Sequence, residues 1–577
     1  MRTICLSIAG VFAIAGTMAA QPVLNAGGIV NAGSYSTDIA AGSIFVGFGS
    51  GMGPATLVAN SSLPLQTTLS GTGMTFTPAA GGTAIQALMV YTSAGQVAGL
   101  LPSSTAPGTY NATLTYNGQT SAAISVTVVA RNFGFVTQAS SGAGPAQATY
   151  GGYNLNRFTT GTLSFSGHTW KLYPANGGNE VVIWGTGAGA DAKSDLNGGS
   201  SGDQTAAGGF IVNIDGIDVK PDYVGRSSGE PGLDQINFKI PANAAPSCFA
   251  NLQVRGNGFT SNLGTLAIAA AGQAACTHPT LSEAELSILD LGGSLVIGDL
   301  FLEKTDTQLT ETGLSFDSKS ETATGQFSKY GVDSVGTASF SLVETGACYV
   351  YQRKGTTQQI SQGTAPVQLN AGTQLTLNGP NASNVPMPML LGTLLYDATL
   401  YTNGFNGIGA QGSPTLTQGQ YTISGTGGPD IGAFQATIDF PGNFTWTNEA
   451  SLTDPIPRSS DLVINWNGGT SGLVAVTGIS ASVTGGTQQN PIYDASLFTC
   501  IAPASAGTLT VSSSILEQLI AVTNNLAGGS YGYLSVLAVP DPTQSKFSAP
   551  TPLTKSGMID QGFIGYSIGA AKTTGWN

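Results

Sequence analysis

An internal duplication constrains the fold more than any other feature of this sequence. Ser43–Gly53 (SIFVGFGSGMG) and Glu180–Ala190 (EVVIWGTGAGA) are each an apolar run that enters a glycine-rich turn, with Gly49 and Gly185 lying 136 residues apart. Further pairs recur at offsets of 139 or 140: Gln96 with Gln235, Pro102 and Pro107 with Pro241 and Pro246, Asn117-Gly118 with Asn257-Gly258, and Thr120-Ser121 with Thr260-Ser261. Two copies of one structural unit are therefore expected in the first half of the chain.

The Asn-Gly pair of each copy lies between two alternating runs, which is the strongest short-range signal for a two-residue β-hairpin with a type I′ turn. Asn111–Tyr116 and Ser121–Val129 flank the first pair, and Asn251–Arg255 and Ser261–Ala269 flank the second. Neither copy contains a stretch of helical periodicity long enough for a crossover helix between parallel strands. Each copy therefore predicts an immunoglobulin-like β-sandwich.

The second half of the chain also alternates, after one short helical signal. Ser282 and Glu285 fit a capping box, and Gly292-Gly293 ends the predicted helix. A second short helix is expected at Ser513–Val522. The alternating runs are Ala338–Val343, Tyr349–Tyr351, Gln420–Ser424, Ala433–Phe440, Asp461–Trp466, Leu473–Val483 and Tyr533–Val539. The predicted fold class is all-β: tandem immunoglobulin-like β-sandwiches followed by a larger antiparallel β-sandwich domain with one or two short helices.

The predicted order of domains is a signal peptide at 1–20, a first immunoglobulin-like repeat at 21–130, a second at 131–278, and a C-terminal β-rich domain at 279–577. Arg2 and the apolar run Ile4–Gly16 indicate the signal peptide, with cleavage before Ala20 or Gln21. This run is shorter than the roughly 20 residues that span a bilayer. We therefore expect a secreted, extracellular or cell-surface protein without membrane insertion.

Four cysteines remain once the signal peptide, which contains Cys5, is removed. An even number in an exported chain indicates disulfides, with three connectivities available. Cys248 and Cys276 flank one predicted hairpin and close a short loop, so we expect them to pair. Cys348–Cys500 then follows by elimination. No Cys-x-x-Cys spacing supports zinc as the alternative.

Six segments of the first half carry a resemblance to a known family: Asn31–Tyr35 (NAGSY), Ala40–Phe48, Gly49–Pro54, Pro64–Leu69 (PLQTTL), Gly232–Phe238 (GLDQINF) and Val254–Leu266. They resemble an uncharacterised secreted domain of Solibacter-type acidobacteria, which is akin to the IPT/TIG immunoglobulin-like modules. The resemblance covers roughly Val23–Ala275 and departs from the family in the polar insert Asp191–Ala207. It implies export and an immunoglobulin-like fold, and the family has no established activity to carry over.

Three short motifs match functional patterns without the context that those patterns need. Gly185–Ala190 is similar to a dinucleotide-binding turn, but a loop follows where the helix that receives a pyrophosphate should begin. Gly565–Gly569 (GYSIG) and Gly198–Gly202 (GGSSG) match Gly-x-Ser-x-Gly, but no His follows Ser567. We expect a structural turn and two chance matches, and assign no catalytic residue.

The acidic insert offers a candidate metal site. Asp191, Asp195, Asn197 and Asp203 are oxygen donors of the kind that Ca²⁺ takes, but they lack the EF-hand spacing and its terminal Glu. We expect a solvated polar loop, with no metal and no cofactor.

Four aromatic residues in the second half, Tyr421, Phe444, Trp446 and Trp466, offer a candidate platform for stacking against sugars. The alternation of Asn443–Thr447 favours a strand with one buried face instead, so we expect core residues.

Composition excludes several function classes. The net charge of −13 makes the chain a poor partner for phosphate backbones, so no nucleic acid is expected. Its two His, His168 in an expected strand and His278 in a linker, exclude sites that need several His ligands. The predicted function is surface interaction or adhesion without catalysis, with an unknown extracellular protein or glycan as partner. The alternative is a carbohydrate-active protein, either a lectin-like binder or a β-sandwich glycoside hydrolase with paired carboxylates.

Overall fold

The computed structural model describes residues 21–577 except 151–153, 166, 312–313, 336–347, 357–363, 405–408, 470–471, 487–490, 526–527, 542 and 544. The predicted signal peptide and the expected strand Ala338–Val343 lie outside these residues. Strand accounts for 52% of the structure and helix for 6%, so the all-β fold class is confirmed.

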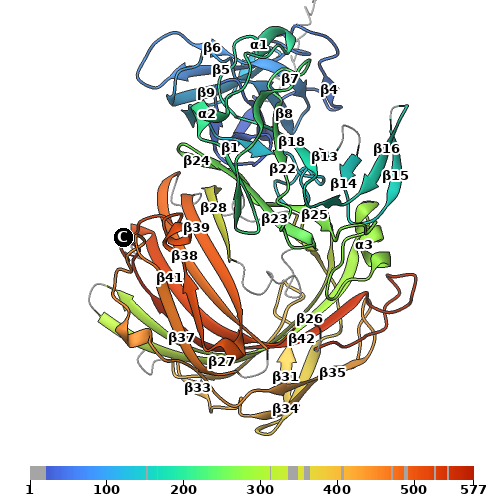
Figure 1. Ribbon diagram of the computed structural model, residues 1–577, viewed down its shortest axis with the longest axis vertical. Helices are drawn as coiled ribbons and strands as arrows, with labels where there is room; N and C mark the ends of the chain where they lie inside the picture. The colour runs from blue at the N-terminus through green and yellow to red at the C-terminus, as the bar shows by residue number, and fades with distance from the viewer. Residues whose placement is uncertain are drawn as a thin grey trace, which may run out of the picture.

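The first repeat is a sandwich of two sheets (Figure 1). Its strands are β1 Val23–Asn31, β2 Asp38–Ala40, β3 Ile44–Ser50, β4 Val58–Ala59, β5 Thr72–Pro78, β6 Ile85–Gln86, β7 Leu88–Thr92, β8 Gln96–Leu100, β9 Gly108–Tyr116, β10 Gln119–Thr120 and β11 Ile124–Val129. One sheet has the order β1-β3-β8-β7-β4. The other has the order β2-β11-β9-β5-β6, with β10 paired to β9.

The second repeat follows the same plan with an added hairpin. Its strands are β12 Gly134–Phe135, β13 Ala148–Tyr150, β14 Asn154–Asn156, β15 Gly161–Phe165, β16 His168–Tyr173, β17 Ala175–Asn176, β18 Glu180–Thr186, β19 Ile211–Ile214, β20 Ile217–Val219, β21 Tyr223–Arg226, β22 Asp234–Lys239, β23 Ser247–Gly256, β24 Phe259–Thr260 and β25 Gly264–Ala269. The order β18-β22-β21 repeats β3-β8-β7, and β25-β23-β19-β20 repeats β11-β9-β5-β6. Strands β14 to β16 have no counterpart in the first repeat and widen its first sheet.

Both Asn-Gly pairs lie at the predicted hairpin tips. Gln119 pairs with Tyr116 across the first tip, and Phe259 pairs with Gly256 across the second. Gly118 and Gly258 both have φ +82°, but of the two asparagines only Asn117 has a positive φ, at 47°. The expectation of a type I′ turn at both tips is therefore wrong for the second one.

A neighbouring glycine turn holds the asparagine of each tip. The Asn257 amide donates to the Gly208 carbonyl at 2.8 Å, at the end of the short helix α2 (Thr205–Gly208). A side chain on Gly209 would collide with Asn257 Oδ1, at 2.6 Å from its Cβ. In the first repeat the Asn117 amide donates in the same way to the Gly71 carbonyl, at 3.1 Å, so this contact is shared by the two tips and does not account for the difference in φ.

Part of the acidic insert is packed between the repeats, so the expected solvated loop is wrong for Asp191 and Asp195, while Asn197 and Asp203 are exposed as expected. Asp191 is 2% exposed and accepts hydrogen bonds from the amide and the hydroxyl of Ser201, at 2.7 and 2.6 Å. Ser103 of the first repeat donates its amide and its hydroxyl to Asp195, at 2.8 and 2.7 Å. Asp195 lies in the helix α1 (Ser194–Asn197). These carboxylates accept protein donors in place of water, so the insert joins the two sandwiches.

The C-terminal region begins with the predicted helix, α3 (Glu283–Asp290), whose capping box between Ser282 and Glu285 is present. Its main sheet has the order β28-β39-β38-β41-β42-β26-β27-β32-β33, with β29 paired to β27. The bounds are β26 Leu295–Glu311, β27 Leu314–Tyr330, β28 Cys348–Thr356, β29 Val367–Gln368, β32 Tyr396–Thr402, β33 Gln411–Gly412, β38 Leu473–Gly486, β39 Pro491–Pro503, β41 Ser530–Val539 and β42 Gln561–Thr573. Strand β42 runs parallel to β26, an exception to the antiparallel order that was expected.

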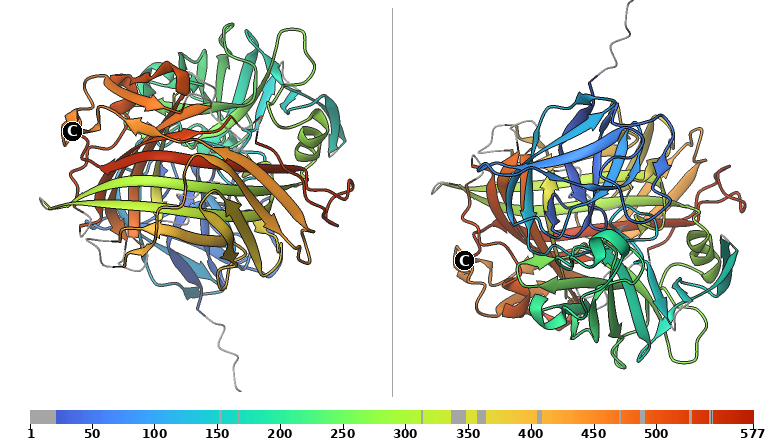
Figure 2. Two further views of the ribbon diagram at one scale, coloured as in Figure 1. Left: turned by 90° about the horizontal axis from the view of Figure 1, so that it is seen from below. Right: turned by 90° about the horizontal axis from the view of Figure 1, so that it is seen from above.

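Two smaller sheets cover one face of this ten-stranded sheet (Figure 2). They are β31-β30-β34-β35 and β36-β37-β40, formed by β30 Gln374–Gly379, β31 Ala382–Pro388, β34 Gly419–Gly425, β35 Phe434–Phe440, β36 Phe444–Trp446, β37 Leu462–Gly468 and β40 Thr508–Val511. The expected helix at Ser513–Val522 is shorter than predicted, since α5 spans Ser513–Leu516.

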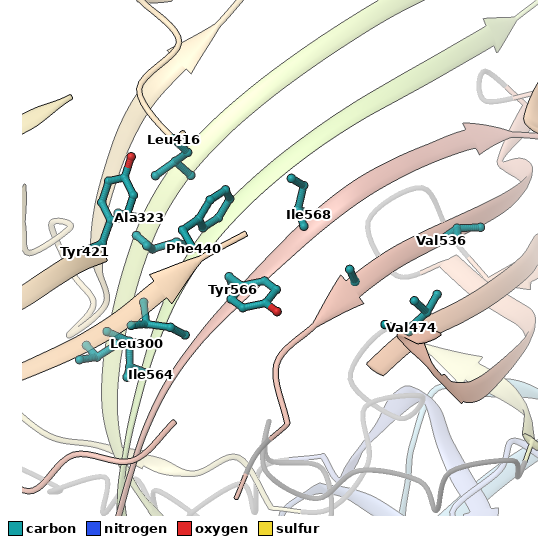
Figure 3. Packing of buried hydrophobic residues seen from close by; sticks show 14 of the residues in the cluster. Leu300, Ala323, Leu416, Tyr421, Phe440, Val474, Val536, Ile564, Tyr566 and Ile568 are labelled. Atoms are coloured by element: carbon teal, nitrogen blue, oxygen red, sulfur yellow. The ribbon is translucent and has the colours of Figure 1, made fainter. Parts of the chain in front are cut away.

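The largest core lies between the ten-stranded sheet and the two smaller sheets. Leu300 of β26 and Tyr566 of β42 point into it from one side, and Tyr421 and Phe440 from the other (Figure 3). The rings of Phe440 and Tyr566 meet edge to face at 5.7 Å. This packing buries alternate residues of every long strand and leaves the intervening residues on the opposite face of the sheet.

Both predicted disulfides are present. Cys248–Cys276 joins β23 to the segment before α3, and Cys348–Cys500 joins β28 to β39, where the two cysteines are direct register partners. Among the described residues, no helix has the length and apolar character to cross a membrane.

Candidate functional site

The candidate site is the face of the ten-stranded sheet opposite the two smaller sheets, and we call it the inner face. The sheet is strongly curved, and its concave side is turned toward the second repeat (Figure 1). The inner face comprises Phe301, Glu303, Thr305 and Thr307 of β26, Ser320, Thr322 and Thr324 of β27, Asp397 and Thr399 of β32, Thr477 of β38, Thr499 of β39, Tyr533 of β41, and Ser567 of β42.

Strand alternation explains why these residues share a face. Leu300 and Leu302 of β26 are fully buried against the smaller sheets, so the odd-numbered neighbour Glu303 points to the other side. Register partners in a sheet lie on the same side, and Glu303 is opposite Thr322 on β27 and Ser567 on β42. The same reasoning extends across the sheet to its outer strands.

Hydroxyl groups dominate the inner face. Nine of its members are Ser or Thr, and all are half-buried or exposed: Thr305, Thr307, Ser320, Thr322, Thr324, Thr399, Thr477, Thr499 and Ser567. The hydroxyls of Thr477 and Thr499 are 3.1 Å apart. Each hydroxyl can both donate and accept, so the face offers both kinds of partner to a ligand.

The carboxylate of Glu303 stands near the middle of this hydroxyl surface. Its side chain keeps contact with solvent, yet the protein around it raises its pKa above the ordinary value. Burial, followed by the nearby charge of Glu303, raises the pKa of Tyr533, and a hydrogen bond with Thr307 opposes that shift. The phenol of Tyr533 therefore stays protonated and can donate a hydrogen bond.

An aromatic pair borders Glu303 on the same face. The rings of Phe301 and Phe563 are 5.7 Å apart and tilted by 52°. They close over Gly565, where a Cβ would come within 2.8 Å of both rings. Phe563 is almost fully buried, whereas Phe301 is half-buried and adds an apolar surface beside the hydroxyls.

A second carboxylate on β26, Asp299, is held away from solvent. Asp299 is 3% exposed, and burial raises its pKa to about 6. Hydrogen bonds from Tyr330 and Gln326 act in the opposite direction and lower this pKa. The Tyr330 hydroxyl donates to Asp299 Oδ2 at 3.3 Å. Asp299 therefore belongs to the base of the inner face and not to its accessible surface.

The two carboxylates of β26 do not form the pair that a glycoside hydrolase needs. Asp299 and Glu303 are four residues apart on one strand, which separates their backbones by about 13 Å. Hydrolysis of glycosidic bonds uses carboxyl groups about 5–9.5 Å apart on either side of the scissile bond. The burial of Asp299 also removes it from a bound sugar, so these two groups do not support a hydrolytic role.

The motif residues singled out from the sequence have structural roles. Trp446 and Trp466 are direct register partners, 5% and 3% exposed, and Tyr421 is fully buried, so they are core residues as expected. In the turn Gly185–Ala190, the Ala188 amide donates to Asp234 Oδ2 at 2.7 Å. Asp234 in turn pairs with Arg226 at 2.9 Å, and both side chains are fully buried.

Among the described residues, His278 and the acidic insert do not form a metal site. His278 Nδ1 accepts hydrogen bonds from the Thr280 and Leu281 amides, and burial followed by the charge of Lys546 lowers its pKa to about 4. His168 lies in β16, as expected. The structure shows, over the residues it describes, no group of three or more His, Cys, Asp or Glu side chains arranged to hold a metal ion.

The inner face was not identified from the sequence. Its signal is an alternation of hydroxyl residues along Phe301–Thr307 and Ser318–Thr324, in two runs joined by a hairpin. Such a period-two pattern of Ser and Thr indicates a strand with one polar, accessible face. The extension of that face across β42, β41 and β38 depends on strand order, which the sequence does not contain.

Comparisons with known proteins leave the family open. No protein-family model matches the chain, and no curated protein matches it. Among solved structures, it is similar to SGBP-B of the Bacteroides ovatus mixed-linkage glucan utilization locus, in complex with a mixed-linkage heptasaccharide, at 10% identity and a TM-score of 0.18. That match covers 63% of this chain and 66% of the other.

Two other similar structures come from a surface layer protein and from chicken CNTN1. Domains 4–9 of the surface layer protein SbsC match at 11% identity and a TM-score of 0.13, over 94% of this chain and 83% of that one. The FN1–FN3 domains of chicken CNTN1 match at 8% identity and a TM-score of 0.10, over 69% and 94%. TM-scores this low do not establish a shared topology.

Proposed function

We propose that this protein is an exported, non-catalytic binding protein whose inner face holds an extended glycan chain. The observation that carries the proposal is the continuous surface of half-buried hydroxyls around Glu303. Export is supported by the two disulfides, which persist in oxidising compartments, and by the resemblance to secreted acidobacterial domains.

The chemistry of the inner face matches a sugar polymer better than an anionic or strongly apolar one. Sugar rings present hydroxyls that donate and accept, as do the Thr and Ser side chains of this face. The half-buried ring of Phe301 and the phenol of Tyr533 add apolar surface with a polar end. The carboxylates of Glu303 and Asp397 disfavour an anionic polymer on the same surface.

The absence of catalysis is part of the proposal. Its support is the backbone separation of Asp299 and Glu303, about 13 Å on one strand, and the burial of Asp299. Release of reducing ends from any polysaccharide by the full chain would overturn this part alone, and would favour a glycoside hydrolase that uses other carboxylates.

The test compares matched Thr→Val variants of the full chain, which replace a hydroxyl by a methyl group of the same shape. The double variant Thr305→Val/Thr322→Val alters the inner face on both sides of Glu303. The control Thr437→Val makes the same change on the solvent-exposed side of β35. Affinity electrophoresis in gels containing neutral polysaccharides reports binding as retardation.

We expect retardation of the wild type and of Thr437→Val by at least one neutral polysaccharide, with clearly weaker retardation for the double variant. Equal retardation of all three proteins would remove the inner face from the site. Migration of the wild type unaffected by every neutral polysaccharide would contradict glycan binding altogether and would favour adhesion to a protein partner.

A further inference from the structure

An aromatic, a glutamine and a tyrosine occur at equivalent positions of the two repeats. In the first repeat, Phe48 of β3 is the register partner of Gln96 of β8, and Tyr91 of β7 is opposite the next residue on that face, Ala98. We call Phe48, Gln96 and Tyr91 the first trio.

The second repeat has the same arrangement. Trp184 of β18 is the register partner of Gln235 of β22, and Tyr223 of β21 is opposite Asn237. We call Trp184, Gln235 and Tyr223 the second trio. The structural match is independent of the sequence offsets, because it follows from the same strand pairs in both sandwiches.

Both trios face away from the sandwich cores. Phe45 and Val97 alternate with the first trio on β3 and β8 and are fully buried in the first core, while Ile183 and Ile236 do the same in the second repeat. The outer face of a sandwich sheet is ordinarily polar. All six trio side chains are half-buried, and Phe48 and Tyr91 also pack against a small buried cluster of Val30, Val46 and Ala98, so each trio keeps only part of its surface in contact with solvent.

The side chains of each trio are already positioned. Gln96 Nε2 donates to the Tyr91 hydroxyl at 2.8 Å, and the ring of Phe48 stacks on Tyr35 at 6.3 Å with an interplanar angle of 27°. In the second trio, Gln235 Nε2 donates to Asn237 Oδ1 at 3.2 Å. The ring of Tyr223 leans over Gly225, where a Cβ would meet its hydroxyl at 2.5 Å.

Backbone strain at Tyr35 enlarges the aromatic surface of the first trio. Tyr35 has φ +60°, a conformation that bulky residues rarely adopt. Asn31 Oδ1 holds this turn by accepting from the amides of Gly33 and Ser34, at 2.7 and 3.0 Å. The Tyr35 hydroxyl donates to the Ser140 carbonyl of the second repeat at 2.5 Å, so the ring is fixed at both ends. Strain of this kind persists where the surroundings enforce it, and it is enriched at binding sites.

We propose that each trio binds one ring of a neutral glycan, which gives the repeats two sugar sites in addition to the inner face. An aromatic ring packs on the C–H face of a sugar, and a glutamine amide both donates to and accepts from sugar hydroxyls. Neither trio contains a carboxylate or an amine, which matches an uncharged ligand. This inference rests on glycan binding as the proposed function, but on residues that the inner face does not share.

The two sites belong to one rigid unit. The Ile44 amide donates to Thr186 Oγ1 at 2.8 Å, and that hydroxyl donates to the Gly232 carbonyl at 2.7 Å. Together with the bonds from Ser103 to Asp195, these fix one sandwich on the other. Sites on a rigid unit engage one polymer with an avidity well above the affinity of either site.

The first experiment uses Trp184 as an internal reporter in the full chain. Quenching of tryptophan fluorescence is followed as a neutral oligosaccharide from a retarding polysaccharide is added, with wild type, Trp184→Phe and the inner-face variant Thr305→Val/Thr322→Val. We expect the inner-face variant to keep a sugar-dependent signal and Trp184→Phe to lose it. A signal that persists in Trp184→Phe and vanishes in the inner-face variant would overturn the second trio and leave the proposed function intact.

The second experiment removes both amides with the double variant Gln96→Met/Gln235→Met, which keeps the length of each side chain. On immobilised neutral polysaccharide, we expect the apparent affinity to fall at least tenfold, with an unchanged thermal unfolding midpoint. Unchanged retention would contradict the trios as sugar sites. The alternative is that the trios bind a second copy of this chain, and sedimentation without sugar tests it. A wild-type dimer that this variant abolishes would assign the trios to contacts between copies and overturn the proposal.

Discussion

Ser121 and Ser261 close the same reciprocal pair of hydrogen bonds in the two repeats. The Leu114 amide donates to Ser121 Oγ at 3.0 Å while the Ser121 amide donates to the Leu114 carbonyl at 2.8 Å. The Val254 amide and Ser261 make the same two bonds, at 2.8 and 2.7 Å. Each serine thus satisfies the backbone where the chain leaves the Asn-Gly hairpin and enters the last strand of its sandwich.

This equivalence predicts equal losses of stability. Ser121→Ala and Ser261→Ala each leave one buried amide without its acceptor, which costs about 1–3 kcal/mol in the free energy of unfolding. Urea denaturation of the two variants measures the loss. Thr120→Ala is the control, since its hydroxyl contacts Thr115 in the open, and we expect a loss of less than about 0.5 kcal/mol there. A serine that could be removed at no cost in one repeat would contradict the shared role.

The glycines at the two hairpin tips should respond alike to a larger residue. Gly118 and Gly258 share φ +82°, and neither has an atom within 4 Å of an added Cβ. Gly118→Val and Gly258→Val therefore act through backbone strain alone, and each should lower the free energy of unfolding by about 1–3 kcal/mol.

The preceding asparagines should differ, and they serve as the internal comparison. Asn117→Ala places a residue that disfavours positive φ at 47°, whereas Asn257 has no positive φ to enforce. We expect a strain cost of about 1 kcal/mol for Asn117→Ala and none from this source for Asn257→Ala. Thermal denaturation of both variants at the same heating rate measures whether the two losses of stability are equal.

The buried pair beneath the glycine-rich turn should be intolerant of losing one partner. Arg226 and Asp234 are fully buried and 2.9 Å apart, and Arg226 also donates to the Gly189 carbonyl at 3.1 Å. Asp234→Asn leaves the buried guanidinium of Arg226 without its carboxylate partner, which should lower the free energy of unfolding by about 3–5 kcal/mol. The double variant Arg226→Met/Asp234→Asn should recover part of that loss in urea denaturation. A double variant less stable than both single ones would show that the hydrogen bonds, and not the paired charge, dominate.

The pKa of Asp299 predicts a pH dependence of stability. Burial raises this pKa to about 6, above the ordinary value of 3.8, so the folded state binds the proton more tightly than the unfolded state. The contribution of Asp299 to the free energy of unfolding is therefore largest below about pH 4 and falls as the pH rises to about 6, by roughly 2–3 kcal/mol.

Urea denaturation of wild type and Asp299→Asn between pH 4 and 7 tests this dependence. Asn mimics the protonated acid, so the variant should lose this part of the slope and gain stability relative to wild type at pH 7. The control Asp439→Asn changes a carboxylate on the exposed side of β35 and should leave the slope unchanged. Parallel pH profiles for wild type and Asp299→Asn would contradict the prediction.

Local features of the sequence predict the repeats, but the sequence does not predict the long-range pairings of strands. The Asn-Gly tips, the capping box at Ser282 and the two disulfides depend on residues close in sequence or on a small number of connectivities, and the structure has them. The burial of Asp191 depends on a contact between two sandwiches, whereas the polarity of this residue alone predicts an exposed side chain. The inner face and both trios likewise arise from the order of strands, which alternation alone does not encode.

The parallel pairing of β26 with β42 has a consequence for how the chain acquires this fold. Strand β42 is hydrogen-bonded between β26 and β41, so it joins the β26-β27-β32 half of the ten-stranded sheet to the β41-β38-β39-β28 half. Until residues 561–573 have been made and released, each half keeps an open edge, the state most prone to pairing with another chain. The ten-stranded sheet can therefore be completed only after residues 561–573 are available, so its two halves should be most prone to aggregation before that point.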